Sequence, residues 1–66
     1  MKFEDLEGVR TLIDFPKHGI KKGEVGTIVH IFSFPSEAYE VEFINKDGST
    51  KVNFAISPEH LEKAGF

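Results

Sequence analysis

The stretch 38-AYEVEFINKDGSTKVNFAI-56 contains two segments in which apolar and polar residues alternate. Alternation with a period of two places the apolar residues on one face of a strand, because successive side chains of a strand point to opposite sides. The residues that would share the buried face are Tyr39, Val41, Phe43, Val52, Phe54 and Ile56. The stretch therefore predicts two half-buried β-strands.

The residues between these two segments predict a tight hairpin. A four-residue loop from Asn45 to Gly48, built on a type I turn, suits INKDGS because Gly48 can adopt a positive φ. Such a loop would place Val41 opposite Val52. A slip by one residue would bring a charged side chain onto the buried face, so the pattern disfavours a register that is shifted by one residue.

The segment VGTIVHIFS at 25–33 is another alternating run. We expect Val29 and Ile31 to face the core, with His30 and Phe32 on the opposite face. The segment VRTLIDF, which starts at residue 9, also reads as a strand, and two phases fit it. Its inward residues are either Val9, Thr11 and Ile13 or Arg10 and Leu12.

The segment SPEHLEKAGF at 57–66 predicts a short turn followed by a strand. Ser57 is suited to an N-cap and Pro58 to the first helical position. Leu61 to Ala64 would then form a short closing strand. Residues 1–66 thus predict a single all-β domain, a small five-stranded SH3-like barrel with one short 3-10 or helical turn near the C-terminus. A barrel protects the edge strands of a small sheet by curling the sheet on itself.

The composition favours a cytoplasmic protein without a membrane segment. The 66 residues include 11 acidic and 8 basic residues, a net charge of −3, which argues against a nucleic-acid partner held mainly through phosphates. The chain has no cysteine, and this excludes disulfides and cysteine-based zinc sites. No apolar run approaches the ~20 residues of a membrane span. The start, MKFEDLEG, lacks the apolar region of a secretory signal.

The stretch 17-KHGIKKGEVGTIVHIF-32 combines glycines and lysines ahead of an apolar run. It lacks the spacing of a phosphate loop, and a predicted strand follows it where a phosphate loop would need a helix. We expect Gly23 to be a turn residue and Gly26 to mark a bulge or a close approach of two backbones. Ile20 would be the apolar anchor that holds the loop on the core.

The segments DFPKHGIKKGEVGTIV and EAYEVEF resemble a small bacterial family of unassigned function, domain of unknown function 4926. The resemblance extends from Val9 to about Leu61. The sequence departs from the family pattern in the second hairpin, where it has Phe34-Pro35-Ser36 in place of a Pro-Asp-Gly type of turn. The resemblance implies an SH3-like barrel, related in shape to KOW modules. It implies no catalytic residues, because none are established for the family.

Two groups of residues are candidates for partner binding. The first is the basic cluster of Lys17, His18, Lys21 and Lys22, which is either a patch for phosphates or an acidic partner, or a solvated loop. The second is formed by Phe32 and Phe34, which either make an exposed aromatic spot near a turn or close one end of the barrel.

Other polar residues do not predict chemistry. The histidines at positions 18, 30 and 60 fall on a loop, a strand face and the last turn, and a metal site needs at least three converging ligands. Glu40 and Glu42 share one strand face, and beside Lys51 they read as a charge-paired solvated face. A barrel of this size has little room for an enclosed pocket. We therefore expect no enzyme activity, no metal and no cofactor.

The leading functional hypothesis is a non-catalytic module that binds another protein. Its alternative is a KOW-like nucleic-acid module that uses the Lys17–Lys22 loop. Both hypotheses expect the loops 16–23 and 33–37 to border one groove, so that the lysines lie near Phe32 and Phe34. The sequence leaves the partner and the oligomeric state open.

Overall fold

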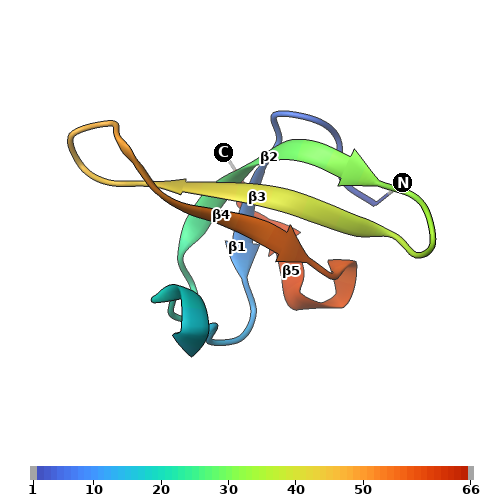
Figure 1. The fold of residues 1–66 in the computed structure, drawn as a ribbon, viewed down its shortest axis with the longest axis horizontal. Coiled ribbons are helices and arrows are strands. Elements are labelled where there is room, and N and C mark those ends of the chain that lie inside the picture. The colour runs from blue at the N-terminus through green and yellow to red at the C-terminus, as the bar shows by residue number, and fades with distance from the viewer. Residues whose placement is uncertain (1, 66) are drawn as a thin grey trace.

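A computed structural model describes residues 2–65 of the chain and contains five antiparallel strands in a single sheet (Figure 1). The strands are β1 (Gly8–Thr11), β2 (Val25–Phe32), β3 (Ala38–Ile44), β4 (Thr50–Ile56) and β5 (Leu61–Lys63). Two 3-10 turns, η1 (Pro16–His18) and η2 (Pro58–His60), precede β2 and β5. The predicted all-β class, the five strands and the 3-10 turn near the C-terminus are confirmed. The two end residues of the predicted domain 1–66 lie outside the described residues.

The order of the strands in the sheet is β4-β3-β2-β1-β5, so β4 and β5 are its two edges. The sheet bends strongly, as the direction of β1 across β3 and β4 shows (Figure 1). Within residues 2–65, no ladder joins β4 to β5. The sheet curls around its core, and the strand ladders of the described residues do not by themselves show closure into a barrel.

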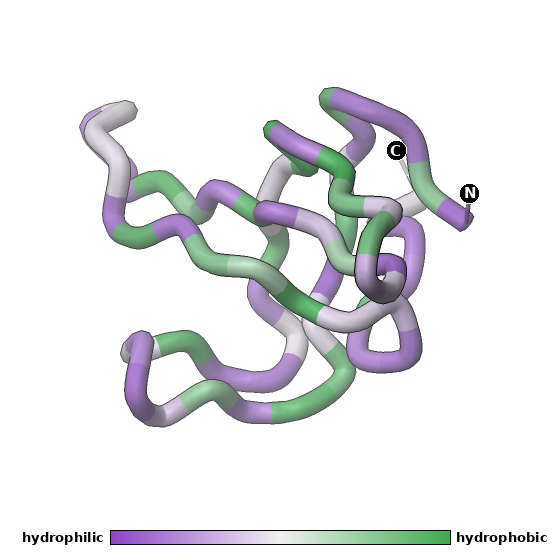
Figure 2. The backbone as a smooth tube through the Cα atoms, turned by 45° about the vertical axis from the view of Figure 1, so that its right-hand side comes forward, coloured by the Kyte–Doolittle hydropathy of each residue, from purple (hydrophilic) through white to green (hydrophobic). Residues whose placement is uncertain are grey.

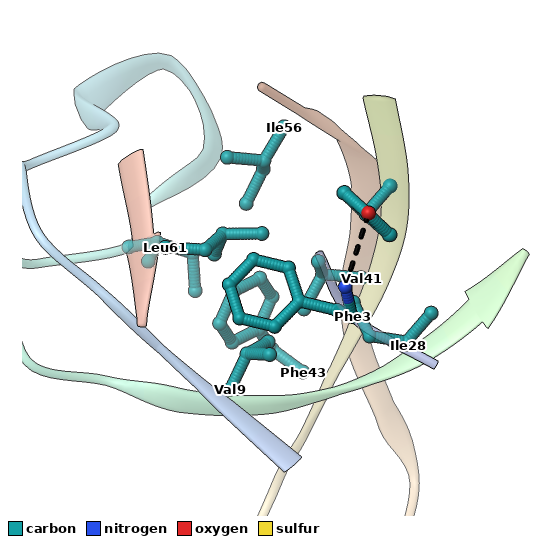
Figure 3. Close-up of a cluster of buried hydrophobic side chains, with 9 residues drawn as sticks. Phe3, Val9, Ile28, Val41, Phe43, Ile56 and Leu61 are labelled. Atoms are coloured by element: carbon teal, nitrogen blue, oxygen red, sulfur yellow. Dashed lines mark hydrogen bonds between the residues drawn. The ribbon is translucent and has the colours of Figure 1, made fainter. Parts of the chain in front are cut away.

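The buried hydrophobic cluster contains at least one side chain from every strand and two from outside the strands. Phe3, from the segment before β1, and Ile20, from the loop after η1, are both 1% exposed. Figure 3 shows Phe3 among residues that come from every strand of the sheet. The buried hydrophobic cluster consists of Phe3, Val9, Ile20, Ile28, Tyr39, Val41, Phe43, Ile56 and Leu61. Ile20 is the loop anchor that the sequence predicts, whereas Phe3 was not predicted as a core residue.

The phase of β1 is settled by the burial of its residues. Val9 and Thr11 are buried, whereas Ile13 lies beyond the strand and is exposed. The hydroxyl group of Thr11 donates to the carbonyl oxygen of Lys21 at 3.0 Å and accepts from the amide of Gly23 at 3.1 Å. These bonds satisfy the buried hydroxyl group of Thr11 and fasten the loop that carries the lysines.

A bulge in β2 overturns part of its predicted phase. The pairing of β2 with β3 shifts between Ile28 and His30, so that Val29 is an extra residue. Ile28 is completely buried and Val29 is 39% exposed, which makes the prediction that Val29 faces the core wrong. The extra residue resets the alternation, and Ile31 packs against the core as expected.

The register of the β3–β4 hairpin differs by two residues from the predicted one. Val41 pairs with Phe54, and Phe43 pairs with Val52. A shift by two keeps every side chain on its predicted face, because the side-chain period of a strand is also two. Figure 2 shows the resulting alternation of hydrophobic and hydrophilic residues along the strands.

The connection between β3 and β4 explains this register. A further irregularity follows Phe43, and residues 45–49 form a five-residue loop in place of the predicted four. The amide of Asn45 donates to the carbonyl oxygen of Ser49 at 2.8 Å, and the amide of Gly48 donates to that of Asn45 at 3.0 Å. Gly48 has φ 90°, as predicted.

The backbone also tests the predictions made for Gly23, for Ser57 and Pro58, and for Gly26. Gly23 has φ 93° and is the turn residue before β2. Pro58 occupies the start of η2, but the side chain of Ser57 makes no capping hydrogen bond. Gly26 marks a close approach of backbones, because a Cβ atom there would lie 2.8 Å from the carbonyl oxygen of Glu42.

Candidate interaction surface

The predicted basic cluster lies on the loop between β1 and β2. Lys17 and His18 belong to η1, while Lys21 and Lys22 follow the buried Ile20. All four side chains of the cluster are exposed. The loop is fixed to the core by Ile20, which forms an antiparallel bridge with Phe15.

Two carboxylates occupy the same loop as the lysines. The amide of Lys21 donates to Oε2 of Glu24 at 2.6 Å, and the amide of Lys22 donates to Oδ1 of Asp14 at 2.7 Å. Glu24 also forms an ion pair with Lys51 of β4 at 3.5 Å. The carboxylates that hold the loop in shape therefore offset part of its positive charge.

The ring of His18 is stacked on the ring of Phe54, with centroids 3.7 Å apart and an interplanar angle of 8°. Phe54 stacks in turn on Phe43 at 5.7 Å, and Phe15 meets Phe54 edge-on at 5.2 Å. His60 of η2 meets the edge of Phe15 at 6.2 Å. Sequence reasoning missed this aromatic group, because it joins residues that are far apart in the chain and belong to four different segments.

The predicted aromatic pair lies at the end of β2 and in the connection that follows. Phe32 is 38% exposed, and the ring of His30 meets it edge-on at 4.5 Å. Phe34 is 78% exposed. Of the two alternatives left by the sequence, Phe34 thus fits an exposed aromatic spot and does not close the end of the sheet.

The lysines and the phenylalanines do not share a groove. The lysine loop precedes the first residue of β2, whereas Phe32 is its last residue. A strand of eight residues spans about 25 Å. Figure 1 accordingly shows η1 far from the connection between β2 and β3. The predicted proximity of the loops 16–23 and 33–37 is wrong.

The connection that carries Phe34 ends at a partly buried polar node around Tyr39. The amides of Lys2 and Phe3 donate to the hydroxyl oxygen of Tyr39 at 3.0 and 3.1 Å, and the hydroxyl group donates to the carboxylate of Glu37. Lys2 also donates to Glu37 at 3.2 Å. This node joins the N-terminal segment to the start of β3.

The node shifts the pKa values of both side chains. Burial raises the pKa of Tyr39, and the hydrogen bond to Glu37 acts in the same direction. The hydrogen bond from Tyr39 lowers the pKa of Glu37, and the bond from the amide of Lys2 adds to this effect. One signal for the node is visible in the sequence: Tyr39 is the single tyrosine, and the alternation places it on the inward face of its strand.

The described part of the chain shows no other site. Within residues 2–65, no pocket is found and no group of three or more His, Asp or Glu side chains could hold a metal ion. In the same residues, no helix has the length and apolar character needed to cross a membrane.

Comparison with known proteins gives one match. Residues 6–63 match a family model described as Domain of unknown function (DUF4926). The match covers most of the chain and confirms the resemblance found in the sequence. No curated protein and no solved structure matches the chain.

Proposed function

We propose that this chain, which belongs to the DUF4926 family, is a small SH3-like, non-catalytic module that binds another protein. The observation that carries the proposal is the exposure of Phe34, whose side chain is 78% exposed. Aromatic side chains that insert into a pocket of a partner supply much of the binding energy of many interfaces. Phe34 is the anchor in this proposal, and the half-exposed ring of Phe32 flanks it.

The connection that carries Phe34 is held at both ends. On one side Phe32 pairs with Ala38 in the sheet, and on the other Glu37 is bonded to Tyr39 and to the amide of Lys2. A loop that is already ordered loses less conformational entropy on binding, so more of the contact energy appears as affinity. The partner would offer an apolar pocket for one aromatic ring.

The nucleic-acid alternative has less support. Single-strand binders combine a basic groove with aromatic rings that are free to stack on bases. Near the lysine loop, the stacked face of Phe54 is covered by His18, and Asp14 and Glu24 lie among the lysines. The exposed rings of Phe32 and Phe34 lie at the other end of β2.

The test compares, in the same assay, a variant of the aromatic anchor with a variant of the lysine loop. The partner is captured on the immobilised chain, identified by mass spectrometry, purified, and titrated by calorimetry with each variant. Phe34→Ser should weaken binding by at least about tenfold, as expected for an anchor residue. The double variant Lys21→Ala, Lys22→Ala should change Kd by less than about threefold, because rim charges act mainly on the association rate.

A second titration addresses the alternative directly. Short single-stranded oligonucleotides are added to isotope-labelled protein at two salt concentrations, and the amide shifts are followed by NMR. We expect no saturable shifts. Saturable, salt-sensitive shifts centred on Lys17, Lys21 and Lys22 would contradict the proposal and favour a KOW-like function.

A further inference from the structure

The two edges of the sheet are protected to different degrees. β5 has three residues, and both of its charged side chains form ion pairs with neighbouring segments: Glu62 with Arg10 at 3.1 Å and Lys63 with Glu7 at 3.6 Å. Short length and charged side chains are the usual means by which proteins prevent an edge strand from pairing with another chain. β5 is therefore a protected edge.

β4 is neither short nor charged over most of its length, and the side chain that lies on it is His18, stacked on Phe54. It has seven residues and no proline, and its segment 52–56 carries no charge. Its inward side chains Val52 and Phe54 are only half-buried, so the core remains incompletely covered along this edge. A long, neutral edge strand with partly exposed apolar side chains is a template for a further strand.

The backbone groups that β4 presents outward can be deduced from the pairing of β2. The amide of Ile28 donates to Glu7 and its carbonyl oxygen accepts from Leu6, so Ile28 bonds away from β3. Its partner Val41 must then bond to the other side, toward Phe54 of β4. By alternation along β4, the N–H and C=O groups of Asn53 and Ala55 point to the open edge.

We propose that the edge of β4 binds a second copy of this chain, with the two β4 strands antiparallel about a two-fold axis at Asn53. Asn53 is the middle residue of Thr50–Ile56, so this register uses the whole strand. It aligns the outward backbone groups of the two Asn53 residues with each other. Each Val52 faces the partner's Phe54, an aromatic–β-branched pair of the kind that stabilises antiparallel strands.

Electrostatics favours a second copy over an unrelated charged peptide. The segment 52–56 is neutral and therefore selects neither an acidic nor a basic partner strand. Pairing about Asn53 brings no two like charges opposite each other, because Lys51 does not meet its own copy. A two-fold axis brings the same surface of both copies together, which is the commonest arrangement of homodimers. This edge does not include Phe34, so the inference is independent of the proposed function.

His18 competes with the second copy for the same position. Its ring is stacked on the ring of Phe54, the side chain against which the partner's Val52 would pack. His18 is itself exposed and belongs to η1, so a different side-chain rotamer of His18 would uncover Phe54. The edge is thus guarded by one side chain, and removal of that side chain should strengthen the self-association.

The first test measures self-association directly. Sedimentation equilibrium from about 20 μM to about 2 mM should show the average mass rising from 7.4 kDa toward twice that value, with a weak Kd. His18→Ala should lower Kd by at least about threefold. A chain that stays monomeric over the whole range both as wild type and as His18→Ala would overturn the proposal.

The second test is specific for the axis at Asn53. Asn53→Lys and Asn53→Glu each place like charges on the axis, so each variant alone should be monomeric, whereas their equimolar mixture should form a heterodimer. Ser36→Lys, which makes the same charge change on the exposed β2–β3 connection, should associate like the wild type. Dispersed amide spectra confirm that each variant is folded. Association of Asn53→Lys alone, or no association in the mixture, would contradict the proposed register.

Discussion

At Tyr39 one hydroxyl group joins three parts of the chain. It accepts hydrogen bonds from the amides of Lys2 and Phe3 and donates one to the carboxylate of Glu37. The side chain that carries it is completely buried. Such a group is satisfied only while it keeps its proton, because an ionised phenol can no longer donate to a carboxylate.

Tyr39 should make the protein sensitive to alkali. Its pKa is raised above the usual value of 10 in the fold, so its contribution to stability is complete below pH 10 and is lost as the pH rises through the folded pKa. The chain has one tyrosine and no tryptophan, so the absorbance of tyrosinate reports this residue alone. The native titration should have its midpoint above that in denaturant. Equal midpoints would mean that the hydroxyl group is not buried as described.

Even a methyl group at Gly26 should destabilise the protein. A Cβ atom there would lie 2.6 Å from Cγ1 of Val41 and 2.8 Å from the carbonyl oxygen of Glu42, and the latter belongs to a paired strand and cannot move away. We expect Gly26→Ala to lower the free energy of unfolding by about 1–3 kcal/mol, as overpacking does. The neighbouring exposed Val25→Ala should change it by about 0.5 kcal/mol or less. Denaturant titrations of both variants would check this order.

At the scale of elements, alternation in the sequence predicts which segments are strands but not where a strand gains a residue. Ile28 and Val29 are both apolar and β-branched, so the pattern cannot choose between them. The phase of β2 is set by contact across the sheet: Gly26 lies against Val41 and faces inward, and Ile28 follows it on the same face.

The limits of sequence alternation also explain why the register of the β3–β4 hairpin and part of the candidate site were not predicted. A shift of two residues leaves the faces unchanged, so the pattern does not detect it, and the loop at 45–49 decides the register through its own hydrogen bonds. The separation of the lysines from Phe32 was predictable, because the lysines precede a strand of eight residues and Phe32 ends it, so the two groups lie at opposite ends of that strand. The stack of His18 on Phe54 was not, since no local pattern brings η1 onto β4.

The bulge in β2 predicts an unequal response to two similar truncations. Ile28→Ala should destabilise the protein by about 2–5 kcal/mol, because the side chain is completely buried. Val29→Ala should cost less than about 1 kcal/mol, because that side chain is 39% exposed. Denaturant midpoints at equal m-values measure the difference. The reverse order would place the bulge elsewhere in the strand.

For the molecule as a whole, the core depends on a residue that stands outside the sheet. Phe3 lies before β1 among acidic neighbours, and no periodicity marks it as buried. Its ring meets that of Tyr39 edge-on at 5.2 Å and fills the centre of the core between β1, β3 and β5 (Figure 3). A sheet of this size leaves one side of its core open unless such a segment covers it.

Phe3→Ala should therefore destabilise the whole domain. We expect a loss of about 3–5 kcal/mol, as for other buried phenylalanines. Small domains have a total stability of about 5–15 kcal/mol, so a sizeable fraction of the variant should unfold at moderate temperature. Leu6→Ala, at a side chain that is 73% exposed in the same segment, is the matched control and should melt like the wild type. Thermal unfolding of the two variants followed by circular dichroism would show it.

The position of β1 in the sheet has a consequence for the speed of folding. β1 pairs with β2, its neighbour in the chain, and also with β5, where Arg10 and Glu62 are 52 residues apart. Closing so long a loop is entropically costly until the rest of the sheet exists, so we expect folding on the order of milliseconds to seconds, with β5 docking late. A truncation at the buried Leu61 of β5 should then mainly accelerate unfolding, whereas one at Val41 should also slow folding. Stopped-flow kinetics of Leu61→Ala and Val41→Ala would separate the two steps, and a Leu61→Ala variant that mainly folds more slowly would place β5 in the folding nucleus instead.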